Sequence, residues 1–504
     1  MAIPTSHSIS IPSCSTGSAI SPSFCFLGRV GECLPLHSIY QSKNSNYVRS
    51  FVGEIAMSVR FGKHAVVVGA GMGGLIAAKA LASHFEKVTV LERDALPTKP
   101  QARTGTPQSR QVHVLLRGGL DALTKFFPDF ETELERAGAV RARVGAEIRI
   151  ELPGFDPFPQ RDLPFDTLCM TRPLVEFVAR RLVEQQGNIA FQLRCRVTRF
   201  LTSPDQSEVV GVRYDAAGGE STTLAADLVV DASSRGTLTL EALDSIGMPR
   251  PAETEIGIDL GYATATFDIP SAAPPDWRAV IHRPAVESGR GAFLFPIENN
   301  RWHVNLNAVH GETPPDDIKD FIAFAKTLRT PTIYDAIKDA TAVGPIYRFG
   351  LPCSVRRQFE ALERFPGRLL PIGDAICRFN PAFGQGMSVV AQQVGVLGRL
   401  LDARTGTGGR LDGLAQAFFA AIQDVLAAPW SAAENDFIYP KTRGQCPANF
   451  QQRLNYSGAL LKLAAEDADV HRILFEVNNL MKPPSALRDP HITSRVAAVM
   501  AASA

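Results

Sequence analysis

From about residue 60 onward, the chain begins with two short apolar runs that are separated by a glycine-rich turn and a helical segment. Residues 64–68 (HAVVV) and 88–92 (VTVLE) are rich in β-branched side chains and predict two buried strands. Between them, an Ala- and Leu-rich segment from Leu75 to about His84 predicts a helix. The pattern therefore predicts a strand, a turn, a helix and a second strand, which is the beginning of an α/β fold.

The turn between the first strand and the helix reads Gly69-Ala-Gly71-Met-Gly73-Gly74, a GxGxxG pattern. In this pattern the first glycine permits the tight turn, the second lets the backbone approach a pyrophosphate, and the third lets helix and strand pack closely. The helix N-terminus presents free N–H groups to the phosphates. Glu92 ends the second strand, where it can accept hydrogen bonds from an adenosine ribose and would repel the 2′-phosphate of NADP. The pattern predicts a dinucleotide site but does not separate FAD from NAD. The residues expected to bind the dinucleotide are Gly69, Ala70, Gly71, Met72, Gly73, Gly74, Glu92 and Arg93.

A second glycine-rich turn follows about 280 residues later. Residues 367–375 (GRLLPIGDA) predict a strand that ends in Gly-Asp, and a helix is expected from Ser388 to about Ala403. The aspartate at the strand end is placed to bind ribityl or ribose hydroxyls, and the helix dipole favours negative charge at the edge of a reduced flavin. The residues expected to bind the cofactor here are Asp374, Pro381, Gly384, Gln385, Gly386 and Met387.

These motifs together resemble the FAD-dependent monooxygenases of the aromatic-hydroxylase superfamily, over roughly residues 62 to 500. Residues 103–113, 226–236 and 295–302 resemble the branch of polyether epoxidases and squalene-epoxidase-like enzymes. The resemblance implies that FAD is the cofactor and that Arg110, Arg172 and Val197 contact it. A surface ion pair is the alternative for Arg110, and an ordinary interior strand is the alternative for Val197.

The sequence departs from the family in two places. Relatives that reduce their own flavin carry an Asp-Gly element, whereas this chain reads Asp231-Ala-Ser-Ser234-Arg235. We therefore expect NAD(P)H to bind only transiently, on the surface near Arg172 or Arg235, or a separate flavin reductase to supply the electrons. The other departure is Gln385-Gly386-Met387, where many relatives place an asparagine after the glycines. It should be tolerated, because the flavin contacts at this turn are mostly made by the backbone.

The function implied by the resemblance is a monooxygenase that inserts one oxygen atom from O2 into an apolar alkene or aromatic substrate through a flavin C4a-hydroperoxide. The cofactor carries the difficult chemistry, so no catalytic side chain is named. The alternatives are an FAD-dependent reductase or dehydrogenase of polyprenyl-type substrates and a non-catalytic FAD-binding protein. His113 is expected to pack or to form a hydrogen bond within a helix. The side chains that either wall a substrate cavity or pack in the core are Phe293, Phe295, Trp302, Phe379 and Phe383.

The expected fold class is α/β, or α+β overall: a Rossmann-type FAD-binding domain, a second domain with an antiparallel sheet, and a helical C-terminus. The FAD-binding domain is expected to be discontinuous, at 62–130, 170–255 and 365–405. Residues 131–169 and 256–364 are assigned to the substrate domain, with a hairpin across Glu298-Asn-Asn300. Residues 406–504 are expected to form a helical region broken by prolines, among them Pro429.

The composition of the chain narrows the ligands and the cellular location that we expect. The net charge is +1 over 504 residues, so no general electrostatic attraction to nucleic acid is expected. The eight cysteines and ten histidines show no zinc spacing, so no metal site is predicted. No apolar stretch is long enough for a membrane span, and the protein is expected to be soluble and cytoplasmic. Residues 1–56 are Ser-rich and almost free of acids, which is typical of a disordered extension or of an organelle-targeting segment.

Overall fold

The computed structural model describes residues 60–274, 276–405 and 410–502. Residues 58–504 form one compact unit. The predictions of disorder or targeting for residues 1–56 lie outside the described residues. The domain boundaries expected within the compact unit stay predictions.

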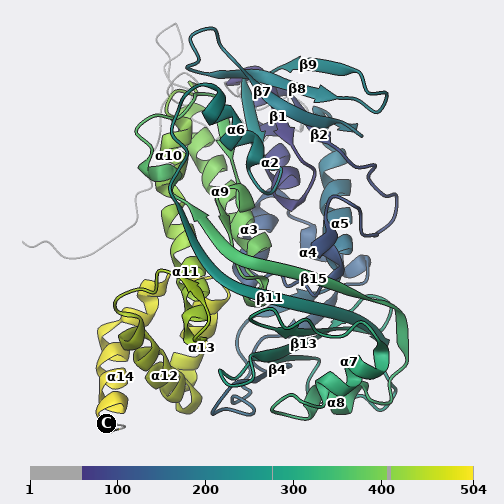
Figure 1. The fold of residues 1–504 in the computed structure, drawn as a ribbon, viewed down its shortest axis with the longest axis vertical. Coiled ribbons are helices and arrows are strands. Elements are labelled where there is room, and N and C mark those ends of the chain that lie inside the picture. The colour runs from purple at the N-terminus through teal and green to yellow at the C-terminus, as the bar shows by residue number, and fades with distance from the viewer. Residues whose placement is uncertain (1–59, 275, 406–409, 503–504) are drawn as a thin grey trace, which may run out of the picture. The chain divides into compact units, whose positions relative to one another are not determined.

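A five-stranded parallel sheet forms the upper half of the unit in Figure 1. Its order is β16 (Leu369–Pro371), β10 (Leu228–Asp231), β1 (Gly62–Val68), β2 (Phe85–Glu92) and β6 (Ile189–Leu193). All four pairings are parallel. Residues of its central strands, such as Val66, Val67 and Val230, are fully buried, as expected for a parallel sheet covered on both faces.

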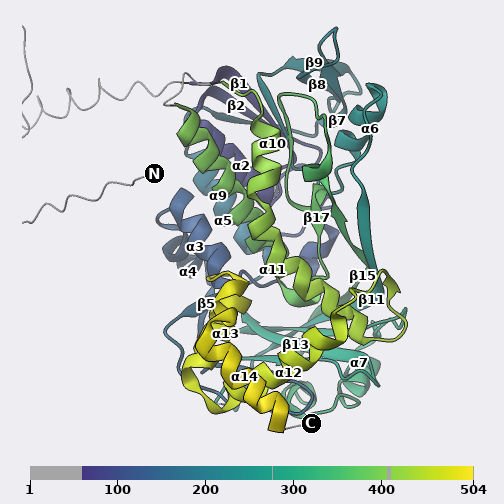
Figure 2. The same ribbon diagram turned by 90° about the vertical axis from the view of Figure 1, so that its left-hand side faces the viewer.

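Helices lie against this sheet and bring its two glycine-rich turns together. The sequence correctly predicts α2 (Met72–Ala82) and α9 (Gly386–Thr405), which run side by side in Figures 1 and 2. The other helices of this half are α3 (Arg117–Phe126), α4 (Phe130–Arg136), α5 (Arg172–Glu184) and α6 (Thr237–Ser245). A three-stranded antiparallel sheet caps the upper end, made of β7 (Arg196–Thr202), β8 (Val209–Asp215) and β9 (Ser221–Ala225).

An eight-stranded sheet occupies the lower half of Figure 1. Its path is β17 (Cys377–Arg378), β15 (Ala342–Arg357), β11 (Glu253–Asp268), β14 (Arg301–Ala308), β13 (Arg290–Ile297), β12 (Ala279–His282) and β4 (Ile148–Glu151), with β18 (Arg443–Gly444) beside β11. All pairings are antiparallel except that of β12 with β4. The predicted hairpin is confirmed: Ile297 of β13 pairs with Arg301 of β14 across the three residues Glu298, Asn299 and Asn300, and both asparagines have positive φ (68° and 55°).

The two faces of this sheet pack against different partners. One face carries Leu294, Trp302 and Val304 and packs on α7 (Ile318–Ala325) and α8 (Thr332–Ile337). The other face carries Phe293 and Phe295, which belong to an apolar cluster shared with the C-terminal helices. Trp302 is therefore a core residue on the face that packs on α7 and α8, which is the second of the two alternatives that the sequence leaves open. A small separate ladder pairs β3 (Val140–Arg143) with β5 (Asp166–Cys169).

The C-terminal region is helical, as the sequence predicts. It contains α10 (Leu414–Ala421), α11 (Gln423–Glu434), α12 (Phe450–Glu466), α13 (Ala468–Asn478) and α14 (Pro490–Ala502). One detail of the prediction is wrong, because Pro429 lies inside α11 rather than ending a helix. Pro429 is buried next to Trp430 and Leu426, so packing outweighs the loss of one backbone N–H donor.

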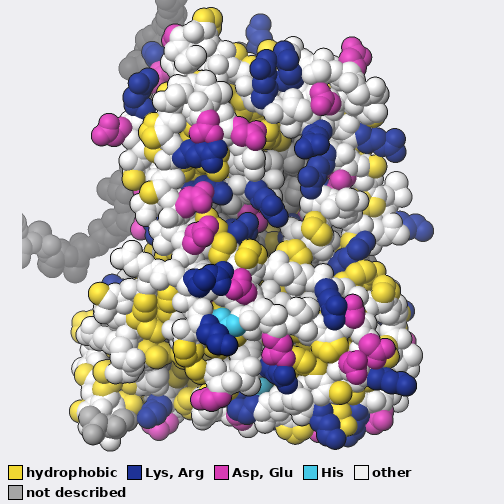
Figure 3. Space-filling view, in the orientation of Figure 1, with side chains coloured by type: hydrophobic (Ala, Val, Ile, Leu, Met, Phe, Trp, Pro, Cys, Tyr) yellow, Lys and Arg dark blue, Asp and Glu magenta, His cyan; other side chains and the backbone are white. Residues whose placement is uncertain are grey.

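Charged side chains of both signs are interspersed over the lower part of the face shown in Figure 3, in keeping with a net charge of +1. Among the helices of the described ranges, none combines the length and the hydropathy that a membrane crossing requires.

Candidate functional site

The first glycine-rich turn joins the end of β1 to the start of α2. Gly69 has a φ of +100°, and a Cβ atom there would lie 2.7 Å from the carbonyl oxygen of Ala232. A Cβ atom on Gly74 would lie 1.9 Å from the carbonyl oxygen of Gly69, so helix and turn are in direct contact. Gly71, which caps α2, has no described atom within 4 Å of a built Cβ position. The turn is thus tightly packed at its first and last glycines and open at the middle one, where a pyrophosphate would approach.

Glu92 lies at the end of β2, where the sequence places it, but its carboxylate already has partners. It accepts hydrogen bonds from the backbone N–H of Ala70 (2.8 Å) and of Asp94 (3.0 Å). Arg103 forms an ion pair with it at 3.2 Å, and also pairs with Asp94 at 2.9 Å. Sequence reasoning missed Arg103 and Asp94, because nothing in the 92–103 spacing indicates that the loop folds back on the strand. Neighbouring Arg93 is exposed and donates to the carbonyl of Gly105 at 3.3 Å.

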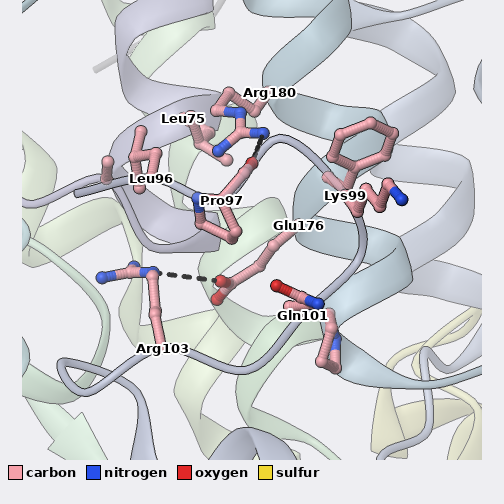
Figure 4. A pocket seen from close by; sticks show the side chains of 11 residues that line it. Leu75, Leu96, Pro97, Lys99, Gln101, Arg103, Glu176 and Arg180 are labelled. Carbon is pink, nitrogen blue, oxygen red and sulfur yellow. Dashed lines mark hydrogen bonds and ion pairs between the residues drawn. The ribbon is translucent and has the colours of Figure 1, made fainter. Parts of the chain in front are cut away.

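The loop after β2 closes against α5 and leaves a small cavity, shown in Figure 4. The cavity has a volume of about 20 Å³, which is room for about one water molecule. Its side chains include Arg103, which forms an ion pair with Glu176 at 3.6 Å, and Arg180, which donates to the carbonyl of Pro97. These buried contacts fix the loop beside Ala70, so the edge of the first turn is held by side chains that the sequence pattern does not reveal.

The second glycine-rich turn follows β16. Gly373 has a φ of +63°, and its N–H donates to Oε1 of Gln393 on α9 at 2.8 Å. Burial raises the pKa of the Asp374 carboxyl, although Arg378 and Arg172 oppose that shift. Its carboxylate accepts no hydrogen bond from any residue in the described part of the chain. Asp374 is thus a half-buried acceptor without a donor among the described residues, which suits a group that binds cofactor hydroxyls.

The backbone from Pro381 to Met387 leads into α9 and is open at its centre. Gly384 has a φ of +69°, and α9 begins at Gly386, where a built Cβ position has no described atom within 4 Å. The Oε1 atom of Gln385 is buried and lacks a hydrogen-bond donor among the described residues. Both turns therefore have an open glycine at a helix start. They lie close together because a Cβ atom on Gly73 of α2 would lie 2.9 Å from Val390 of α9.

Asp436, from the C-terminal region, contacts the residue that precedes the second turn. Asn380 precedes it, and its Nδ2 atom donates to both carboxylate oxygens of Asp436, at 3.1 and 2.9 Å. Burial raises the pKa of Asp436 to about 7, against the opposing effects of Asn380 and Arg283. Arg283 donates from Nη1 to the carbonyl of Ala382 at 3.0 Å. No motif in the sequence points to Arg283 or Asp436, since one follows a strand of the large sheet and the other lies in the C-terminal region.

The remaining residues expected at the cofactor lie in three different settings. Arg110 is exposed, with its guanidinium 4.7 Å from the centre of the Tyr347 ring. Arg172 is buried at the start of α5 and pairs with Glu176 at 2.6 Å. It lies close enough to Asp374 and to His113 to shift the pKa of both. Val197 is buried in β7. Arg172 is thus the one of the three that lies near Asp374 of the second turn, and the prediction that it is a surface residue is wrong because it is buried.

Comparison with known proteins now identifies the family. Residues 63–414 match the sequence profile of a family described as an FAD binding domain. The chain belongs to this FAD-binding family, within the aromatic-hydroxylase superfamily of flavin monooxygenases. Its cofactor is FAD, and it is a flavin-dependent oxidoreductase.

Similar proteins include Protein Rv3254 of Mycobacterium tuberculosis, which is 33% identical over 68% of this chain and 73% of that protein. Squalene monooxygenase 1,1 of Brassica napus is 22% identical over 67% of this chain, which spans about three fifths (62%) of it. Two solved structures share the fold. One is p-nitrophenol 4-monooxygenase PnpA from Pseudomonas putida DLL-E4, with a TM-score of 0.58 and 17% identity over 84% of this chain and 99% of that one. The other is PqsL, a probable FAD-dependent monooxygenase from Pseudomonas aeruginosa, with a TM-score of 0.54 and 15% identity over 75% and 98%. Membership in the epoxidase-like branch stays a prediction.

This flavoprotein has a buried polar row on the face of the large sheet that is turned toward the second glycine-rich turn. Thr264 of β11 donates to Oε1 of Gln111 at 2.6 Å, and Asn305 of β14 donates to the Thr264 hydroxyl at 2.8 Å. Gln111 also donates to the carbonyl of Tyr347 at 3.0 Å. The network joins Gln111, which follows Arg110, to the large sheet. The sequence pattern of β14 does not predict this network, because both faces of the strand are buried.

Two histidines lie beside this row and are uncharged at neutral pH. Desolvation lowers the pKa of His113 to about 3 and that of His303 to about 4. Nδ1 of His113 lies 2.9 Å from the carbonyl of Gln111. The prediction of a helical position for His113 is wrong, since it lies in an extended segment before α3, whereas the prediction that it forms a hydrogen bond is confirmed. Within the described ranges, no group of three His, Cys, Asp or Glu side chains is arranged to hold a metal ion.

Proposed function

We propose that this flavoprotein inserts one oxygen atom from O2 into an apolar substrate, an alkene or an aromatic ring. One observation carries the proposal. Phe293 and Phe295 of the large sheet share an apolar cluster with Val112, Val114 and Ala382, the last of which lies in the second glycine-rich turn. An apolar surface next to the turn that would hold the flavin ring suits a substrate with few polar groups.

The chain's own residues bind, orient and exclude water. When bound, FAD accepts hydride and activates O2, and the protein supplies the dry, shaped site in which that chemistry is productive. His113 and His303 are uncharged at neutral pH, so neither imidazole acts as an acid on this wall. Thr264, Gln111 and Asn305 form hydrogen bonds with one another on the sheet face next to the second turn. Their polar groups are therefore less available to bind water there.

We propose that the cofactor is held at both open glycines. Gly71 and the N-terminus of α2 would bind the pyrophosphate, while Gly386 and the N-terminus of α9 would lie against the flavin ring. Asp374 and the buried Oε1 atom of Gln385 lack protein donors and would accept hydrogen bonds from cofactor N–H or O–H groups. The other members of the proposed site are Gly69, Ala70, Met72, Gly73, Gly74, Glu92, Arg93, Arg110, Arg172, Val197, Pro381, Gly384 and Met387.

We propose that the electrons come from NAD(P)H bound transiently or from a separate flavin reductase. The region that replaces the family's Asp-Gly element lies at the end of β10. There Asp231 is fully buried and accepts hydrogen bonds from Ser233 (2.5 Å) and Thr239 (2.6 Å). These contacts leave Asp231 occupied within the fold. Arg235 is exposed and can meet a nucleotide on the surface.

The decisive experiment reduces the FAD-loaded protein without oxygen, using NADH, NADPH or dithionite, and then admits ¹⁸O2 with a panel of polyenes and phenols. We expect one ¹⁸O atom per product molecule and O2 consumption that depends on substrate. A product that is reduced or desaturated without ¹⁸O would overturn the proposal in favour of a reductase or dehydrogenase. A slow reduction by both nicotinamides, with rapid turnover after dithionite, would identify a reductase-dependent enzyme. Epoxide and phenol products distinguish the alkene from the aromatic alternative.

A further inference from the structure

Arg283 carries a half-buried positive charge that forms no ion pair within the described ranges. It follows β12 at the edge of the large sheet, and its guanidinium lies 5.5 Å from the centre of the Phe383 ring and 5.9 Å from that of Phe293. Among the described residues, its guanidinium makes one hydrogen bond, the donation from Nη1 to the carbonyl of Ala382. Within the described ranges it forms no ion pair, although a guanidinium offers five N–H donors.

The nearest carboxylate is a poor counter-ion. Asp436 and Arg283 are close enough to affect each other's pKa, yet they are not in ion-pair contact. Both oxygens of Asp436 accept from Nδ2 of Asn380, and burial raises the pKa of this carboxyl to about 7. Asp436 is therefore neutral in a large fraction of molecules near pH 7, and Arg283 remains charged throughout.

A second polar group beside Arg283 also lacks a partner. Tyr262 of β11 is 4% exposed, and its hydroxyl finds neither donor nor acceptor among the described residues. Tyr262 belongs to the same apolar cluster as Phe293, and the Arg283 guanidinium lies 5.9 Å from the centre of the Phe293 ring. Burial and Asp436 raise the pKa of the Tyr262 phenol, and Arg283 lowers it. A buried hydroxyl without a partner costs free energy, and so does a half-buried cation without an anion. Both groups, near Phe293 and the turn at Ala382, are suited to bind an oxygen atom of a ligand.

We propose that Arg283 and Tyr262 form an anion-binding subsite, which holds a carboxylate or phenolate oxygen of an otherwise apolar substrate. The inference rests on the proposed function, since it names the substrate class of that same site. Arginine suits this task because its planar fork donates two parallel hydrogen bonds to a carboxylate. The rings of Phe293 and Phe383 would contact the apolar part of the same molecule and keep water away from the ion pair.

The test measures binding to the FAD-loaded protein without turnover, by titration calorimetry and by the change in flavin absorbance. The probes are 2-naphthoate and its neutral counterpart of similar size, 2-naphthamide. For the wild-type protein we expect the carboxylate to bind at least about tenfold more tightly than the amide. Arg283→Gln should abolish this preference, Arg283→Lys should retain part of it, and Tyr262→Phe should weaken 2-naphthoate by about three- to tenfold with the fold intact.

Arg278→Gln is the matched control, because Arg278 is an exposed arginine just before the same strand and pairs with Glu147 at 3.1 Å. It should leave the preference unchanged. Absence of any preference in the wild-type protein, or failure of both probes to bind, would overturn the proposal. So would an Arg283→Gln variant that loses FAD but keeps the preference, since Arg283 would then only support the carbonyl of Ala382. Because no oxygen chemistry is read out, a failed ¹⁸O experiment and a failed binding experiment remain distinguishable.

Discussion

The parallel sheet and the large antiparallel sheet bury their side chains in different ways. In the parallel sheet, the buried residues of β1 and β10 are aliphatic on both faces, apart from Asp231 at the strand end. In the large sheet, β14 buries Val304 and Leu306 on one face and His303, Asn305 and Asn307 on the other. The first sheet is a mainly aliphatic scaffold. The second sheet directs a face with polar and aromatic side chains toward the flavin-binding half. We therefore expect the large sheet to recognise the substrate.

We expect the largest loss of stability from a side chain placed at Gly74, where the helix and the first turn are in closest contact. Gly74→Val places a side chain against the carbonyl oxygen of Gly69, 1.9 Å from the Cβ position, and neither backbone segment can move away without breaking the turn. We expect insoluble or unfolded protein, measured by soluble yield and circular dichroism. Gly395→Ala on α9 is the control, because its Cβ would meet only Nη1 of Arg399, at 3.7 Å. Soluble, folded Gly74→Val protein would show that the turn is less rigid than described.

Thr264→Val tests whether the polar face of the large sheet depends on its hydrogen bonds. The substitution keeps the shape but removes the donor to Gln111 (2.6 Å) and the acceptor for Asn305 (2.8 Å). We expect the free energy of unfolding to fall by roughly 1–3 kcal/mol, the cost of leaving buried polar groups unpaired. Urea denaturation measures the change, and an unchanged midpoint would mean that the network is dispensable.

The buried histidines make the large sheet sensitive to acid. His303 has a pKa of about 4 when folded, below its usual value near 6.5, so the unfolded chain binds more protons between these values. Its contribution to stability is therefore complete above about pH 6.5 and is lost as the pH falls toward 4. In His303→Gln the dependence of unfolding free energy on pH should flatten by about 1.4 kcal/mol per pH unit across this window. Parallel curves for variant and wild type would contradict the lowered pKa.

Ser234→Gly should give the smallest change, and it should be stabilising. Ser234 has a φ of +81°, in a region that favours glycine. Relief of this strain should raise the free energy of unfolding by up to about 1 kcal/mol. A lower denaturation midpoint would mean that the added freedom of the unfolded chain outweighs the relief.

Local patterns in the sequence predicted the elements that depend on neighbouring residues. The strand, turn and helix at residues 62–82 and the hairpin at 290–308 follow from alternation, glycine spacing and two asparagines in a tight turn. Contacts between distant segments could not be predicted in this way. Arg103 folds back onto Glu92, Asp436 holds Asn380, and Arg283 lies against Ala382 across 99 residues. The sequence could not decide whether Trp302 walls a cavity or packs in the core, because both faces of β14 are buried and the pattern leaves its orientation open.

The most direct test of the account is the flavin content of Gly71→Val. No described atom lies within 4 Å of the built Cβ position of Gly71, so the variant should fold. Its side chain would occupy the space through which the pyrophosphate approaches the start of α2. We predict wild-type circular dichroism and elution volume with almost no bound FAD after purification in excess cofactor. Stoichiometric FAD in the folded variant would show that the cofactor is not held at this turn.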